Sequence, residues 1–119
     1  MAECVDGIGG VFFRTRDPDA LRAWYAQHLG IEMEDYGTTF TAQAGDQTVW
    51  APFAADTSYF GAAEQQLMVN FRVRDLEAML EQLRAAGVEV DEDVRELEFG
   101  RFGWAVDLEG NRLELWEPA

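Results

Sequence analysis

The sequence predicts an α+β fold in which two tandem βαβββ modules form one curved eight-stranded mixed sheet with two outer helices. Three observations carry this prediction: an internal repeat, a helix pattern in each half, and short strand patterns after each helix. The repeat pairs residues 13–21 (FRTRDPDAL) with residues 71–79 (FRVRDLEAM) at an offset of 58 positions, and each half closes on Trp-x-Pro. Two related units that share an apolar face enclose a cavity between them, so we expect the function there.

Each half contains one helix pattern with the same start and stop signals. In the first half, Asp17 can cap a helix that begins at Pro18, and Gly30 ends it. Asp75 and Gly87 give the same two signals in the second half. Apolar residues three and four positions apart give each helix one stripe that can face a core: Leu21, Trp24, Tyr25, His28 and Leu29 in the first, and Leu76, Met79, Leu80 and Leu83 in the second.

Strand patterns, separated by glycine-containing turns, surround these helices. In the first half they cover residues 8–15, 31–36, 38–44 and 47–53. In the second half the repeat places a strand around Phe71, and three more follow at 88–95, 101–107 and 112–116. We therefore predict a single domain over residues 1–119, with module one at about 7–53, a linker at 54–66 and module two at about 67–118.

Composition excludes several classes of partner. The 119 residues carry a formal net charge of -14, which repels nucleic acid and anionic membrane surfaces. The apolar stretch at residues 8–13 is too short to span a bilayer. The chain contains one cysteine, Cys4, so it cannot form an internal disulfide, which fits a reducing environment. We expect a cytoplasmic protein that binds neither nucleic acid nor membrane.

Alternation along the strands predicts which side chains face the cavity. In the first strand of each half, the apolar residues suit the helix side, which leaves Phe12, Arg14, Asn70 and Arg72 on the other side. The last strands add Thr48, Trp50, Glu114 and Trp116 if the Trp-x-Pro endings set the register. The residues predicted to bind a ligand are Phe12, Arg14, Thr48, Trp50, Met68, Asn70, Arg72, Trp104 and Trp116.

Two motifs within this doubled unit resemble the vicinal oxygen chelate superfamily. They are RDPDALRAWYxxxLG at residues 16–30 and DLEGNRLELWEP at residues 107–118. The superfamily includes glyoxalase I, extradiol dioxygenases, and fosfomycin and bleomycin resistance proteins. The resemblance covers nearly the whole chain and implies a glyoxalase-like cup, but its motifs are poor guides to the reaction.

The resemblance also implies where a metal would be held. Metal-dependent members take one ligand from the first strand and one from the last strand of each module. These positions are Gly10, Thr48, Met68 and Glu114 here, and the 58-residue offset pairs Gly10 with Met68 independently. Glycine offers no side-chain ligand atom and a thioether is too soft for the ions concerned. We therefore predict no conventional metal centre and no cofactor.

Glu114 is the predicted catalytic residue, with three readings. It could be a general base whose pKa is raised by an aromatic cup, one partner of an ion pair with Arg14 or Arg72, or a surface carboxylate if the register slips. The two arginines could equally clamp an anionic ligand. His28, the one histidine, lies on the core stripe and is expected to be structural.

Three functional hypotheses follow. The first is a bleomycin-resistance-like protein that binds a small aromatic or amphipathic molecule without metal. The second is a lyase or isomerase of the glyoxalase type, similar to lactoylglutathione lyase, that uses Glu114 as base with a non-standard or absent metal. The third is a purely structural subunit. Small superfamily members pair about a twofold axis and free strand edges invite pairing, so we also predict a homodimer.

Overall fold

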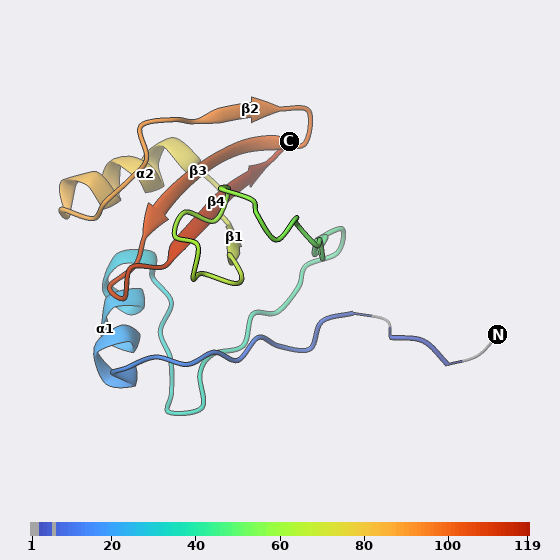
Figure 1. The fold of residues 1–119 in the computed structure, drawn as a ribbon, viewed down its shortest axis with the longest axis horizontal. Helices are drawn as coiled ribbons and strands as arrows, with labels where there is room; N and C mark the ends of the chain where they lie inside the picture. The colour runs from blue at the N-terminus through green and yellow to red at the C-terminus, as the bar shows by residue number, and fades with distance from the viewer. Residues whose placement is uncertain (1–2, 6) are drawn as a thin grey trace.

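The computed structural model describes residues 3–5 and 7–119, and it has an α+β architecture with a mixed sheet and two helices (Figure 1). The sheet is four-stranded in the order β1-β4-β3-β2. β1 runs parallel to β4, whereas β3 is antiparallel to both of its neighbours. In chain order the elements are α1 (Pro18–Leu29), β1 (Asn70–Arg72), α2 (Leu76–Ala85), β2 (Arg95–Leu97), β3 (Gly100–Val106) and β4 (Arg112–Pro118).

Both helices begin and end where the sequence predicts. The Asp17 carboxylate accepts a hydrogen bond from the Ala20 N–H at 3.1 Å, and Asp75 does the same for Ala78 at 3.0 Å. Gly30, with φ of 69°, adopts the left-handed conformation that ends α1. The carboxylate of Glu117 in β4 also accepts from the Leu76 N–H at 2.8 Å, which ties the end of the sheet to the start of α2.

One hydrophobic core lies between the sheet and both helices. It takes side chains from one face of the sheet because residues two apart along a strand point to the same side. Gly103 lies where any Cβ would approach the Leu80 side chain to 2.9 Å, so β3 and α2 pack closely. The buried cluster consists of Leu21, Tyr25, Leu76, Leu80, Leu83, Ala105, Leu113 and Leu115.

The turn between β3 and β4 fastens α1 to the second half of the chain. The buried Asp107 carboxylate accepts from the Tyr25 hydroxyl at 2.8 Å and from two backbone N–H groups of its own turn. Glu109 accepts from the Thr15 hydroxyl at 2.6 Å and from the Arg16 N–H at 2.9 Å. The motif at residues 107–118 therefore has a structural role, because it joins α1 to the sheet.

The strands predicted for the first half are not formed. Residues 8–15, 31–36, 38–44 and 47–53 contain no strand, and Glu34 and Gly37 form an isolated bridge. All four strands of the described residues lie in the second half. Of the strand predicted at 88–95, only an isolated bridge between Val90 and Ala105 and the first residue of β2 are formed. Alternating side chains indicate which face of a strand would be buried, but a strand forms only where a neighbour pairs with its backbone. The described residues of this single chain therefore form a four-stranded sheet and not the predicted eight-stranded one.

The first-half segments remain extended and expose large apolar side chains. Phe12 is 92% exposed, Trp50 is 84% exposed and Phe40 is 70% exposed. Within the described residues, no helix is long and apolar enough to cross a membrane.

Candidate functional site

The sheet has one face that the helices do not cover, and we call it the open face. Cα partners on neighbouring strands point to the same side, so the register assigns its side chains. Trp104 pairs with Glu114, which pairs with Asn70; Phe102 pairs with Trp116, which pairs with Arg72. The open face carries Asn70, Arg72, Arg95, Phe102, Trp104, Arg112, Glu114 and Trp116.

Glu114 lies at the centre of the open face and is only 7% exposed. Its Oε1 accepts from the Asn70 amide at 2.7 Å, and its Oε2 accepts from the Trp104 indole N–H at 2.9 Å and from the Tyr59 hydroxyl. We call these four residues the Glu114 cluster. All three donors are neutral, and together they occupy most of the roughly four lone-pair positions of a carboxylate.

The linker at residues 54–66, drawn in green in Figure 1, contributes Tyr59 to this cluster. The Tyr59 ring meets Trp104 edge-on, with ring centroids 5.9 Å apart, and stacks on Phe53 at 5.5 Å. Arg112 lies over Trp104 at 5.2 Å and donates to the Tyr59 carbonyl at 3.0 Å. Its guanidinium also pairs with Asp91 at 3.2 Å. The linker is therefore packed against the open face.

The hydroxyl of Tyr59 is held as a hydrogen-bond donor. Burial, together with the hydrogen bond to Glu114 and that carboxylate's charge, raises the pKa of Tyr59 from 10.0 to about 12. The nearby positive charge of Arg95 acts in the opposite direction but does not cancel these effects. Tyr59 therefore keeps its proton at neutral pH and donates it in the hydrogen bond to Glu114.

Beside the Glu114 cluster lies a pair of partly exposed aromatic rings. Phe102 and Trp116 are nearly parallel, with an interplanar angle of 9° and ring centroids 6.2 Å apart. The Trp116 indole N–H donates to the Phe99 carbonyl at 3.1 Å, which fixes the ring. Together the two rings form a stacked apolar pair that is partly exposed on the open face.

The structure brings together only some of the residues predicted for the site. Asn70, Arg72, Trp104, Glu114 and Trp116 share the open face. The other predictions do not join them: Phe12, Arg14, Thr48 and Trp50 lie exposed in the unpaired first-half segments, and Met68 is half-buried before β1.

The predicted ion pair between Glu114 and an arginine is not formed. Arg72 instead contacts the Asp46 carboxylate at 3.4 Å and the Gln47 carbonyl at 3.0 Å. Alternation along the strands alone made an ion pair across the sheet plausible. In the structure, three neutral donors form hydrogen bonds with the buried carboxylate instead.

Sequence reasoning missed Tyr59, Arg95 and Arg112. Tyr59 lies in an irregular linker, where no period indicates the direction of a side chain. A cluster of aromatic residues at positions 53, 59 and 60 was the signal for a packed linker. Arg112 lies two residues before Glu114, so alternation along β4 was the signal for it, whereas Arg95 could be placed only with the register of β2.

The metal-ligand positions of the superfamily do not fit a metal here. Gly10, Thr48 and Met68 provide no donor of the required kind. The oxygens of Glu114 already accept three hydrogen bonds. Among residues 3–5 and 7–119, no group of three or more His, Cys, Asp or Glu side chains could hold an ion.

Comparison with known proteins agrees with this architecture. The fold and the sequence pattern place the chain in the vicinal oxygen chelate superfamily. Within it, the chain belongs to the family of glyoxalase-like domains, whose pattern matches residues 10–116. No curated protein matches the chain.

Several solved structures are similar over most of their length. A protein of unknown function from Agrobacterium tumefaciens str. C58 has a TM-score of 0.57 and 20% identity, with 94% of this chain and 98% of that chain covered. TnmS3, an antibiotic binding protein from Streptomyces sp. CB03234, has a TM-score of 0.55 and 23% identity, with coverages of 87% and 88%. A member of the glyoxalase/bleomycin resistance protein/dioxygenase superfamily from Sphaerobacter thermophilus DSM 20745 has a TM-score of 0.54 and 19% identity, with coverages of 87% and 90%.

These similarities concern the fold alone, because each identity is below 25%. The chain also spans only about half the length of two other solved structures that it matches, 46% and 48%.

Proposed function

We propose that this protein binds a small aromatic or amphipathic molecule on its open face without the conventional metal centre. The observation that carries the proposal is the stacked, partly exposed Phe102–Trp116 ring pair beside a buried carboxylate with three hydrogen-bond donors. Small-molecule sites are largely apolar, with a few well-placed polar groups. A structurally similar protein, TnmS3, is described as antibiotic binding, which supports the same class of function.

The alternative function, a lyase or isomerase of the glyoxalase type, receives less support. A general base needs a lone pair within hydrogen-bond reach of the substrate proton. Three of the roughly four lone-pair positions of Glu114 are engaged by its donors, and the side chain is only 7% exposed, so little of the carboxylate is within reach of a substrate. We therefore assign Glu114 a positioning role, in which it holds the Tyr59 and Trp104 rings that border the ligand.

Tryptophan emission tests the proposed function directly. A Trp24→Phe, Trp50→Phe double variant leaves Trp104 and Trp116 as reporters. Naphthalene-2-carboxamide and naphthalene-2-carboxylate are expected to quench or shift this emission, and EDTA is expected to leave the binding unchanged. Trp116→Leu should weaken binding by about tenfold or more through loss of ring contact. If calorimetry confirms that neither probe binds to the wild type, the proposed function is wrong for flat aromatic ligands.

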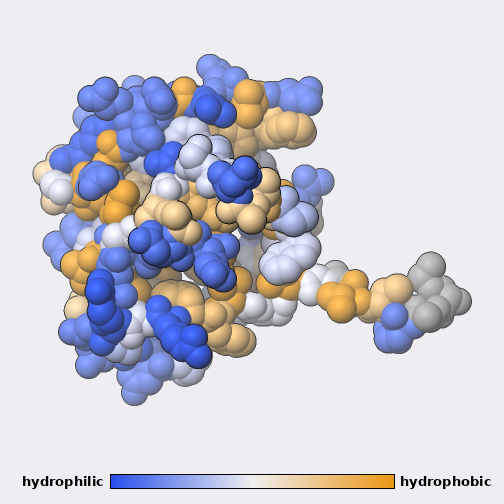
Figure 2. Space-filling view, in the orientation of Figure 1, coloured by the Kyte–Doolittle hydropathy of each residue, from blue (hydrophilic) through white to orange (hydrophobic). Residues whose placement is uncertain are grey.

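We also propose that the protein is a homodimer in which the first-half segments complete the sheet to eight strands, as two modules within one domain. Extended segments with exposed large apolar side chains are sites of protein–protein contact. Figure 2 shows the N-terminal segment standing clear of the rest of the chain, with apolar side chains along it. The outer edge of β1 has no strand beside it in the described part of the chain, so its backbone groups are open to pairing.

Sedimentation at micromolar concentration is expected to give the mass of two chains. In that state, backbone N–H groups of residues 8–15 and 47–53 should exchange with deuterium more slowly than those of the linker, because strand pairing protects them. A monomer whose first-half segments exchange as fast as the linker would contradict both parts of this proposal. The cytoplasmic location stays a prediction.

A further inference from the structure

A single row of side chains crosses all four strands on the open face. The register pairs Arg72 with Trp116, Trp116 with Phe102, and Phe102 with Arg95. Since neighbouring strands lie about 4.8 Å apart, the two ends of the row are separated by roughly 14 Å at the backbone. The row therefore places two aromatic rings between two guanidinium groups.

The two guanidinium groups differ in their partners. Arg72 already has a carboxylate beside it, because Asp46 lies 3.4 Å away. Arg95 is exposed, and no carboxylate of residues 3–5 or 7–119 lies within ion-pair distance of it. Glu114, the carboxylate on the same face of the sheet, is engaged by its three donors. Arg95 thus remains an unpaired positive charge beside the rings in a chain of net charge -14.

We propose that this row binds a planar aromatic molecule that carries an anionic group, with its rings on Phe102 and Trp116 and its anion at Arg95. The inference rests on the proposed function and specifies the ligand. A guanidinium offers a planar fork that matches a carboxylate and also packs against ring faces. Arg72 lies at the other end of the row. Its ion pair with Asp46 offsets its positive charge, so little net charge remains there to bind a second anion.

The test compares two probes of nearly equal shape and different charge. Naphthalene-2-carboxylate is expected to bind the wild type about tenfold more tightly than naphthalene-2-carboxamide, because one charge-assisted hydrogen bond distinguishes them. Arg95→Gln should remove this preference while the carboxamide keeps its affinity. Calorimetry gives both affinities, and thermal melting verifies that the variant is folded.

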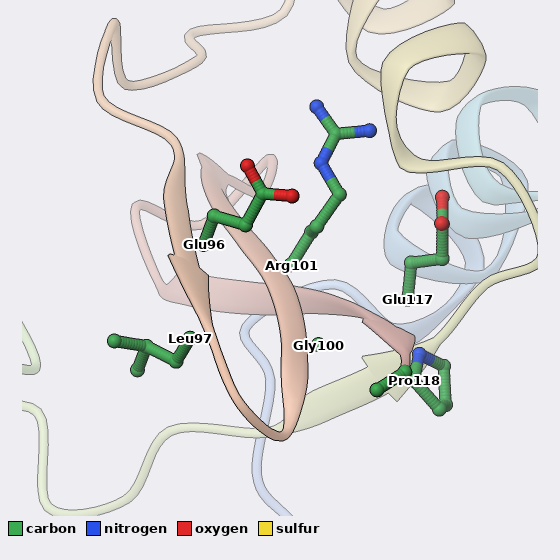
Figure 3. A pocket seen from close by; sticks show the side chains of 7 residues that line it. Glu96, Leu97, Gly100, Arg101, Glu117 and Pro118 are labelled. Atoms are coloured by element: carbon green, nitrogen blue, oxygen red, sulfur yellow. The ribbon is translucent and has the colours of Figure 1, made fainter.

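Arg101→Gln is the matched control. Arg101 follows Gly100 in β3, and its side chain projects with those of Glu96 and Glu117 from the side of the sheet opposite Leu97 (Figure 3). Leu97 lies two residues after Arg95 in β2 and so shares the side of Arg95. Both substitutions change the net charge equally, so a loss of preference in Arg95→Gln alone would identify a local contact with the anion.

The possible failures are distinguishable. Equal binding of the two probes to the wild type would overturn the anion inference and leave the proposed function in place. A preference that survives in Arg95→Gln, or that Arg101→Gln removes as well, would also overturn it. Absence of binding by both probes would remove the proposed function itself.

Discussion

Gly100→Ala is expected to lower the free energy of unfolding by about 3–5 kcal/mol. Gly100 is buried at the start of β3 and has a φ of 135°, which residues with a Cβ rarely adopt. An added Cβ would also meet the backbone carbonyl of Glu117 and approach the Trp116 indole nitrogen to 2.8 Å. A backbone atom within the sheet cannot move aside cheaply, so strain and overlap act together. Urea denaturation measures the loss.

Gly110→Ala separates these two causes. Gly110 has a φ of 84° but no heavy atom lies within 4 Å of its added Cβ, so this variant carries the backbone strain without the overlap. It is expected to cost about 1 kcal/mol. Equal losses in the two variants would mean that β3 and β4 do not approach as closely at Gly100 as the structure has them.

Glu114→Leu is expected to destabilise the protein by about 2–3 kcal/mol, because it leaves the buried Trp104 indole N–H without an acceptor. Glu114→Gln should cost only about 1 kcal/mol. The glutamine oxygen can accept from Trp104 and Tyr59, and the Asn70 amide can turn to present its oxygen to the new NH₂ group. Chemical denaturation compares the two variants, with the exposed Glu96→Leu as a control of small effect. Equal costs would mean that the three donors do not depend on Glu114.

Glu114→Gln should also change the titration of Tyr59, which absorbance spectroscopy can follow. The pKa of Tyr59 is about 12 in the folded protein against an ordinary 10.0, so between these two pH values folded Tyr59 keeps its proton while unfolded Tyr59 has lost it. The free energy of unfolding therefore falls as the pH rises through this range. Glu114→Gln removes the carboxylate charge and should lower the pKa of Tyr59, while burial keeps it above the ordinary value. Phenolate absorbance in a Tyr36→Phe background measures the shift. An unchanged titration would show that Glu114 does not control the tyrosine proton.

The parts of the fold that local chemistry specifies could be predicted from the sequence. Asp17, Gly30, Asp75 and Gly87 act within a few residues of themselves, and both helices begin and end near them. The register of β4 could also be predicted, because leucines alternate with polar residues: Leu113 and Leu115 enter the core and Glu114 faces away. This alternation brought Asn70, Trp104 and Trp116 into the candidate site beside Glu114.

The remaining strands and site residues depend on long-range contacts, which the periodicity of the sequence does not specify. The first-half segments have the alternation of strands, but they lack a neighbouring backbone in a single chain, so Phe12 and Trp50 did not reach the site. Tyr59 lies in an irregular linker and is placed by Glu114, which is 55 positions away in the sequence. The number of strands and the composition of the site are therefore properties of long-range pairing.

The hydrogen bonds that join the α1 region to the 107–111 turn determine how the chain would respond to proteolysis. The Tyr25–Asp107 and Thr15–Glu109 hydrogen bonds join residues more than eighty positions apart, and the helix adds Leu21 to the shared core. A nick in the exposed stretch between residues 38 and 53 would therefore leave two fragments bound to each other, with α1 as the non-covalent link. The unit of cooperative unfolding thus crosses the boundary of the sequence repeat, and it combines a helix from the first copy with the sheet of the second.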